Sequence, residues 1–180
     1  MNTRKFVAVS IFIAITCLLQ ILSTYINFMG FPITLSLIPI IIGGALYGVG
    51  FGSILGLSFG IIVCLMVILG LDPAGATMFS QNWLATIFVC LFKGLAAGFM
   101  GALIYKLINN KKVAIIVSSL IATLTNTITF IIVLFLFFDY SFSTAISLLL
   151  SINFLLEIII NVVIAPSLLP ILNKRKHKTI

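Results

Sequence analysis

Two oppositely charged residues stand inside long apolar segments, and they are the first candidates for chemistry. Glu157 is the only acidic residue in such a segment, and Lys93 is the only other charge deep within one. An ionisable group at membrane depth costs about 2.5 kcal/mol or more on insertion scales, so it normally faces the interior of a helix bundle. The two charges therefore predict either a ligand-binding site or a Lys93–Glu157 ion pair that only holds two helices together.

Polar neighbours favour the binding site. Asn153, Glu157 and Asn161 are spaced i, i+4, i+8, so on a helix they form one polar stripe on an apolar cylinder. At a helical rise of about 1.5 Å per residue, Lys93, Asn126 and Glu157 lie about 16, 17 and 20 Å below the outer ends of their segments. Three polar groups on three helices thus meet at one depth. That set of donors, acceptors and both charge signs suits a small polar ligand better than a simple packing pair.

Two aromatic residues lie near the outer end of the segment that carries Lys93. Phe79 belongs to the polar stretch 72–81, and Trp83 begins the apolar segment that follows it. If residues 72–81 form a loop over the polar layer, both rings lie at the rim of the site. Trp83 equally fits the aromatic belt at a membrane interface. The candidate substrate-binding residues are thus Phe79, Trp83, Lys93, Asn126, Asn153 and Glu157.

Composition places the chain in a membrane. Its 180 residues are 62% hydrophobic and 7% charged, and the mean hydropathy is +1.37. No soluble core of this size needs so much apolar surface, whereas an integral membrane protein does. The net charge of +7 is therefore not a nucleic-acid signal. The sequence shows no phosphate-binding loop, catalytic elbow or metal-spaced Cys/His cluster, so we expect no enzyme activity, no metal, no cofactor and no nucleic-acid partner.

Six apolar segments predict an all-α integral membrane protein with six transmembrane helices and a single transmembrane domain over residues 1–180. The polar stretch 72–81 is expected to be a loop, and the last helix is expected to end near Pro166 and Pro170. The expected helices cover about residues 6–24, 34–46, 51–69, 82–108, 113–138 and 144–172.

The positive charges give an orientation. With six spans, one side of the membrane holds both termini and the turns after the second and fourth helices. Every Lys and Arg except Lys93 falls on that side: Arg4, Lys5, Lys106, Lys111, Lys112, Lys174, Arg175, Lys176 and Lys178. Cytoplasmic loops carry this excess, so both termini are expected in the cytoplasm. The basic C-terminal tail is expected to anchor this topology and to touch anionic lipid of the bilayer.

Small residues recur at helical spacing in two places. Glycine occupies every fourth position from residue 44 to residue 60, a pattern that lets membrane helices approach closely. We favour tight packing between the second and third helices, with docking of a partner protein as the alternative. Ser10 and Ala14 form a second, shorter pair of small residues on the first helix.

Several of these features resemble the substrate-binding membrane subunit, or S component, of energy-coupling factor (ECF) vitamin transporters, and the resemblance covers nearly the whole chain. The stretches 38–43 and 52–60 are similar to the second and third helices of the pantothenate-type branch. The remaining matches are Phe79-Ser80, Lys93-Gly94, Asn126-Thr127, and Asn153 with Glu157. Two positions depart from the pattern: Phe92-Lys93 replaces a Pro-Arg pair, and Ser10-x-x-x-Ala14 replaces a pair of alanines.

The resemblance implies a specific division of labour. An S component binds one vitamin with high affinity from outside. It then docks on a coupling module, made of a transmembrane subunit and two ATPases, and topples to release its cargo inward. It would place this chain in the bacterial plasma membrane and give Ser10 and Ala14 the contact with the coupling subunit. Pantothenate is the first substrate to expect, because Lys93 could pair with its carboxylate. Folate, riboflavin, pyridoxine and pyrimidine-type vitamins stay open.

Two other functions compete with this hypothesis. A self-contained secondary carrier could use Glu157 as a proton site, although such carriers usually show inverted repeats or broken helices. A membrane scaffold or holin-like protein would bind no ligand at all.

Overall fold

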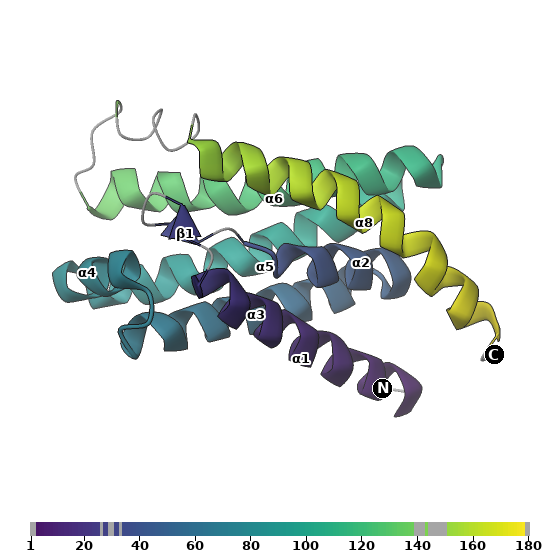
Figure 1. The fold of residues 1–180 in the computed structure, drawn as a ribbon, viewed down its shortest axis with the longest axis horizontal. Helices are drawn as coiled ribbons and strands as arrows, with labels where there is room; N and C mark the ends of the chain where they lie inside the picture. The colour runs from purple at the N-terminus through teal and green to yellow at the C-terminus, as the bar shows by residue number, and fades with distance from the viewer. Residues whose placement is uncertain are drawn as a thin grey trace.

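The computed structural model describes residues 3–25, 27–28, 31–32, 34–138, 143 and 151–178. These residues form an elongated bundle of helices that run roughly along one axis (Figure 1). The described helices are α1 (Thr3–Tyr25), α2 (Leu37–Tyr47), α3 (Val49–Ile68), α4 (Pro73–Gln81), α5 (Trp83–Leu107), α6 (Lys111–Phe137) and α8 (Ile152–Lys178). Two short strands, β1 (Asn27–Phe28) and β2 (Phe31–Pro32), pair antiparallel between α1 and α2.

Five of these helices are long and apolar enough to cross a membrane. They are α1, α3, α5, α6 and α8, and their apolar stretches are 20 to 27 residues long. The sixth apolar helix, α2, has only 11 residues, and its residues 37–44 are all buried. A helix that is apolar all round belongs in the interior of a bundle, and α2 contacts α1, α3, α5, α6 and α8. The prediction of an all-α, multi-pass membrane protein is thus confirmed, with α2 as its buried centre.

The prediction of a loop at residues 72–81 is wrong. Residues 73–81 form α4, which begins with a side-chain cap: the carboxylate of Asp72 accepts a hydrogen bond from the backbone N–H of Gly75 at 3.2 Å. Pro73 occupies the first helical position, where its missing N–H has no intrahelical partner to lose. Asp followed by Pro is therefore a start signal for a helix, although Pro and Gly are also typical of loops.

The expected end of the last helix is also wrong. Helix α8 continues through Pro166 and Pro170 to Lys178, while residues 144–150 lie outside the described residues. Proline removes a backbone hydrogen bond, but membrane helices tolerate it when other groups satisfy the freed carbonyls. Pro166 and Pro170 free the carbonyls of Val162 and Pro166, and next to the first of these the hydroxyl of Ser167 donates to the carbonyl of Val163 at 2.7 Å.

The glycine row packs mainly against α5 rather than between α2 and α3. A Cβ added at Gly52 would lie 2.7 Å from the carbonyl oxygen of Gly98, and one at Gly56 would overlap the carbonyl of Gly94. The backbones of α3 and α5 therefore touch along this row, as small residues permit. Apart from Gly48 at the turn between α2 and α3, the glycines of the row are buried and face other helices of the same chain.

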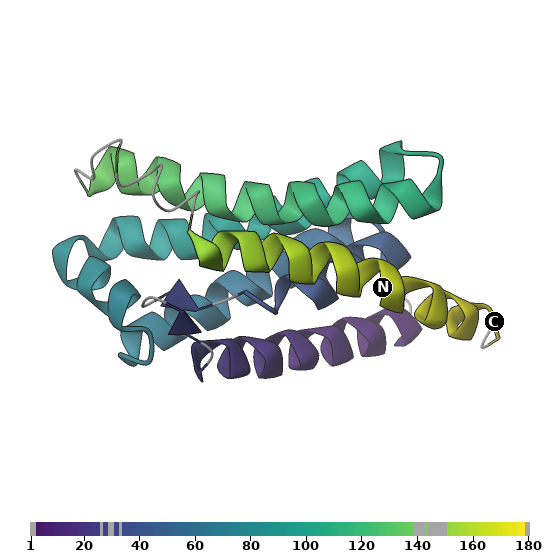
Figure 2. The ribbon, with the colours of Figure 1, turned by 45° about the horizontal axis from the view of Figure 1, so that its top comes forward.

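Both termini lie at one end of the bundle, on the right in Figures 1 and 2. The turn between α2 and α3 is at the same end, where Gly48 adopts a φ of 98° that favours glycine. The connection between α5 and α6 is there too, whereas α4 and the strand pair lie at the opposite end. We refer to these as the terminal end and the α4 end.

Candidate substrate-binding site

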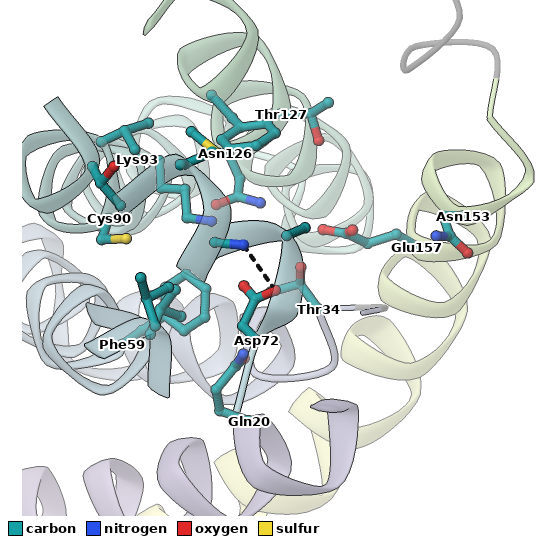
Figure 3. A pocket seen from close by; sticks show the side chains of 18 of the residues that line it. Gln20, Thr34, Phe59, Asp72, Cys90, Lys93, Asn126, Thr127, Asn153 and Glu157 are labelled. Carbon is teal, nitrogen blue, oxygen red and sulfur yellow. Dashed lines mark hydrogen bonds between the residues drawn. The ribbon is translucent and has the colours of Figure 1, made fainter. Parts of the chain in front are cut away.

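A cavity of about 130 Å³ lies between the helices toward the α4 end. Residues from α1, α3, α4, α5, α6, α8 and the turn before α2 line it, so almost the whole bundle contributes (Figure 3). The apolar lining residues include Phe59 and Val63 of α3 and Phe154 of α8. The polar lining residues are Gln20, Thr34, Asp72, Thr86, Lys93, Asn126, Thr127, Ser151, Asn153 and Glu157. A polar cavity inside a membrane bundle is the setting expected for a small ligand.

Four of the six candidate residues line this cavity. Lys93 comes from α5, Asn126 from α6, and Asn153 and Glu157 from α8. Asn126, Asn153 and Glu157 are 5%, 8% and 7% exposed, so all three are withdrawn from lipid and solvent. The three helices thus bring together the groups that the regular helical rise placed at one depth.

Lys93 and Glu157 extend toward the cavity from opposite walls (Figure 3). No salt bridge joins them in the described part of the chain. Instead, the ammonium of Lys93 lies 5.1 Å from the ring centroid of Phe130, a distance typical of a cation–π contact. The carboxylate oxygen Oε1 of Glu157 is buried without a hydrogen-bond partner. The two charged side chains therefore lie on either side of the cavity without bonding to each other, whereas a purely structural ion pair would join α5 to α8 directly.

Phe79 and Trp83 do not line the cavity. Trp83 is the first residue of α5 and is 55% exposed, as an interfacial aromatic residue would be. Phe79 is half-buried on α4 and packs against the hydrophobic core. Their expected place at the rim depended on a loop at residues 72–81. Because residues 73–81 form a helix, the position of each residue on α4 or α5 sets the direction of its ring.

Six polar lining residues were not among the candidates: Gln20, Thr34, Asp72, Thr86, Thr127 and Ser151. The carbonyl oxygen of the Gln20 side chain accepts a hydrogen bond from the hydroxyl of Ser36 at 2.7 Å, which ties α1 to the turn before α2. That turn also places Thr34 in the cavity lining together with Glu157. Asp72 combines the cap of α4 with a place in the cavity wall. Its position before a proline was the one available signal, and it marked the cap only.

The third member of the predicted polar stripe has a different environment. Asn161 is fully buried, and its amide donates to the hydroxyl of Thr123 on α6 at 3.0 Å. It is not among the residues that line the cavity. One helical turn beyond Glu157, the polar stripe therefore changes from lining a cavity to joining α8 to α6.

The fold and the cavity define a class: a multi-pass helical membrane protein with a cavity between its helices that polar and charged side chains line. A comparison with protein families identifies the chain more closely. The profile of the ECF transporter substrate-specific component family matches residues 4–169. The chain therefore belongs to that family, whose members are transporter components and not enzymes. The family implies a small-molecule substrate and coupling to an ECF module. Neither a search of curated proteins nor a search of solved structures finds a match.

Proposed function

We propose that this protein is the high-affinity substrate-binding subunit of an ECF-type importer for a vitamin or a related micronutrient in the bacterial plasma membrane. The observation that carries the proposal is the cavity itself. In a membrane bundle of this family, buried polar groups from three helices surround a space of about 130 Å³. Polar groups at this depth are unfavourable unless a partner satisfies them, and a bound substrate supplies such a partner.

We also propose six spans with both termini in the cytoplasm. Helix α2 is the sixth span, shortened by the turn before Leu37 and sheltered from lipid by its neighbours. The described lysines near helix ends, Lys5, Lys106, Lys111 and Lys112, lie at the terminal end of the bundle. By the positive-inside rule this end faces the cytoplasm, so the cavity lies toward the outer surface.

The coupling partner is proposed to contact α1. Ser10 and Ala14 are both exposed on this helix. The hydroxyl of Ser10 donates to the carbonyl of Phe6 at 3.1 Å, within its own helix. The helix therefore presents a shallow surface there, without a protruding polar group, and a second membrane helix could approach it closely. In this proposal a transmembrane subunit with two ATPases supplies the energy.

Pantothenate stays a prediction as the substrate. It rests on the resemblance of the sequence to the pantothenate-type branch and on Lys93 as a counter-ion for a carboxylate. Lysine keeps the charge of the arginine expected there but loses its bidentate geometry.

Reconstitution tests the function. The purified chain is placed in vesicles with or without an ECF module, and uptake of the compound that co-purifies with it, identified by native mass spectrometry, is followed with external substrate. The expected result is retention of the compound in both cases and uptake only with the module and ATP inside. Uptake driven by a proton gradient without the module would instead identify a self-contained carrier.

A further inference from the structure

The charged groups of the cavity are unequal in sign. Asp72 at the start of α4, Glu157 on α8 and Lys93 on α5 all line it. Two carboxylates against one ammonium give the lining a formal charge of −1. Figure 3 shows the side chains of all three directed into the same space. The N-terminus of α4 offsets part of the Asp72 charge, but no second cation of the described residues lines the cavity.

The buried groups without partners are acceptors. Oε1 of Glu157 and Oδ1 of Asn126 have no hydrogen-bond partner, and their residues are 7% and 5% exposed. A buried acceptor without a donor is unfavourable. A ligand that satisfies these atoms must therefore bring N–H or O–H groups. A carboxylate would bring further acceptors to the same place.

The ammonium of Lys93 already has a favourable partner within the protein, so a ligand anion is not required to stabilise it. This group lies 5.1 Å from the centroid of the Phe130 ring, whose negative face attracts it. Two carboxylates attract a cation in the middle of the cavity, and one ammonium repels it. An anion in the same place is repelled by two groups and attracted by one. Since opposite charges attract strongly where water is scarce, the balance favours the cation.

The volume limits the ligand's size. An apolar cavity of about 150 Å³ holds one benzene ring, and this cavity measures about 130 Å³. Phe59 of α3 and Phe154 of α8 both line the cavity and offer apolar contacts to an aromatic ring. One ring with short substituents is therefore the size that fits.

We infer that the substrate is a single nitrogen-containing ring that carries a positive charge or a protonated amino group, which faces Asp72 and Glu157. This inference rests on the proposed function and gives that site a substrate class. It departs from the prediction of pantothenate, which is an acid and which the cavity would hold only through Lys93.

Three compounds with the same ring test the sign of the charge. Pyridoxamine, pyridoxine and 4-pyridoxic acid carry an aminomethyl, a hydroxymethyl and a carboxyl group at the same ring position. Calorimetry on the full chain in lipid nanodiscs should give the tightest binding for pyridoxamine, weaker binding for pyridoxine and the weakest for the acid, with steps of about tenfold. Tighter binding of 4-pyridoxic acid or of pantothenate, or no binding of any of the three rings, overturns the inference.

Charge variants provide a second test with an internal control. Asp72→Asn keeps an N-cap residue of equal quality, so α4 should persist, and Glu157→Gln keeps an acceptor. Each should weaken pyridoxamine binding about tenfold and leave neutral pyridoxine within about threefold, which also shows that the variant is folded. Lys93→Gln should tighten pyridoxamine binding, because it removes the ammonium that repels a cation in the cavity. Loss of pyridoxamine binding only in Lys93→Gln overturns the inference.

The reconstitution experiment distinguishes an error in the substrate class from an error in the proposed function. If the substrate class is wrong but the proposed function is right, an anionic compound co-purifies and is taken up in vesicles that contain the ECF module. If the proposed function is wrong, no compound of any charge co-purifies or is taken up with the module. A co-purifying compound that migrates as a cation in electrophoresis supports both.

Discussion

The same two helices behave differently at the two ends of the molecule. Toward the terminal end, α3 and α5 touch through glycines, with Gly52 facing Gly98 and Gly56 facing Gly94. Toward the α4 end, α3 presents Val63 and Val67 instead, and both residues line the cavity. The contrast shows that the change from glycine to larger side chains along α3 marks where packing ends and the site begins.

Polar groups follow the same division. Around the cavity, Glu157 and Asn126 retain acceptors without partners. Deeper in the bundle, Thr123 accepts from Asn161, and the hydroxyl of Ser118 on α6 donates to the carbonyl of Gly101 on α5 at 2.6 Å. The polar contacts of the terminal half thus join neighbouring helices, although Oδ1 of Asn161 has no partner there, while the unpartnered oxygens of Glu157 and Asn126 belong to residues that line the cavity. Substitutions in the two halves should therefore separate stability from binding.

The largest effect is expected in the glycine seam. Gly56→Leu places a side chain against the Gly94 carbonyl, and the two backbones cannot separate without disturbing the whole seam. We expect a loss of about 3 kcal/mol or more in stability, seen as aggregation in size-exclusion chromatography or a lowered unfolding temperature in detergent. Gly50→Ala is the control, because a Cβ there meets nothing within 4 Å. An equally stable Gly56→Leu protein would contradict the close packing.

The next largest effect is expected on uptake alone, with stability and ligand binding unchanged. Ser10→Trp or Ala14→Trp adds a bulky ring to the exposed face of α1, which is remote from the cavity lining. Uptake with the coupling module should be lost, because the ring prevents close approach of a second helix. Binding should stay within about twofold of wild type, since neither residue lines the cavity. A variant that loses binding instead would show that this face of α1 shapes the site.

Binding should be most sensitive to the charge that the ligand meets. Removing one partner of a buried charge pair usually weakens binding by about 2 kcal/mol or more. If the cargo is a cation, Glu157→Ala should show this loss, and Lys93→Ala should show less. If the cargo is an acid, the order reverses, and Lys93→Arg should then be tolerated. Calorimetry with the co-purified compound measures the order, and wild-type affinity in all three variants would place the site elsewhere.

The smallest effect is expected at the start of α4. Asp72→Ala removes the cap on Gly75 and should lower stability by about 1 kcal/mol, whereas Asp72→Asn retains a cap and should change it little. Thermal unfolding without ligand compares the two. Equal losses in both variants would show that the charge of Asp72, and not its cap, stabilises this end.

The sequence predicts those features that depend on one helix at a time. Lys93, Asn126 and Glu157 reach one cavity because the rise of a helix is regular, so their depths can be counted along the chain. The glycine row could be recognised as a packing surface for the same reason. Its main partner, α5, could not, because the choice between neighbouring helices depends on how the whole bundle assembles.

The errors arose where one local signal was misjudged. Pro73 and Gly75 are typical of loops as well as of helix starts, so a loop at residues 72–81, with Phe79 and Trp83 at the rim, is the prediction that α4 contradicts. Asp72 lies outside every predicted span, and it was therefore not considered part of the site. That omission bears on the proposed substrate, because Asp72 changes the formal charge of the cavity lining from zero to −1.

The most direct test of the account is an experimental structure of the chain with its co-purified compound. The account predicts density for one small molecule between α5, α6 and α8, with a donor group of the ligand within hydrogen-bonding distance of Glu157 and Asn126. Density for the compound outside this cavity, with Lys93 and Glu157 paired to each other inside it, would contradict the central claim.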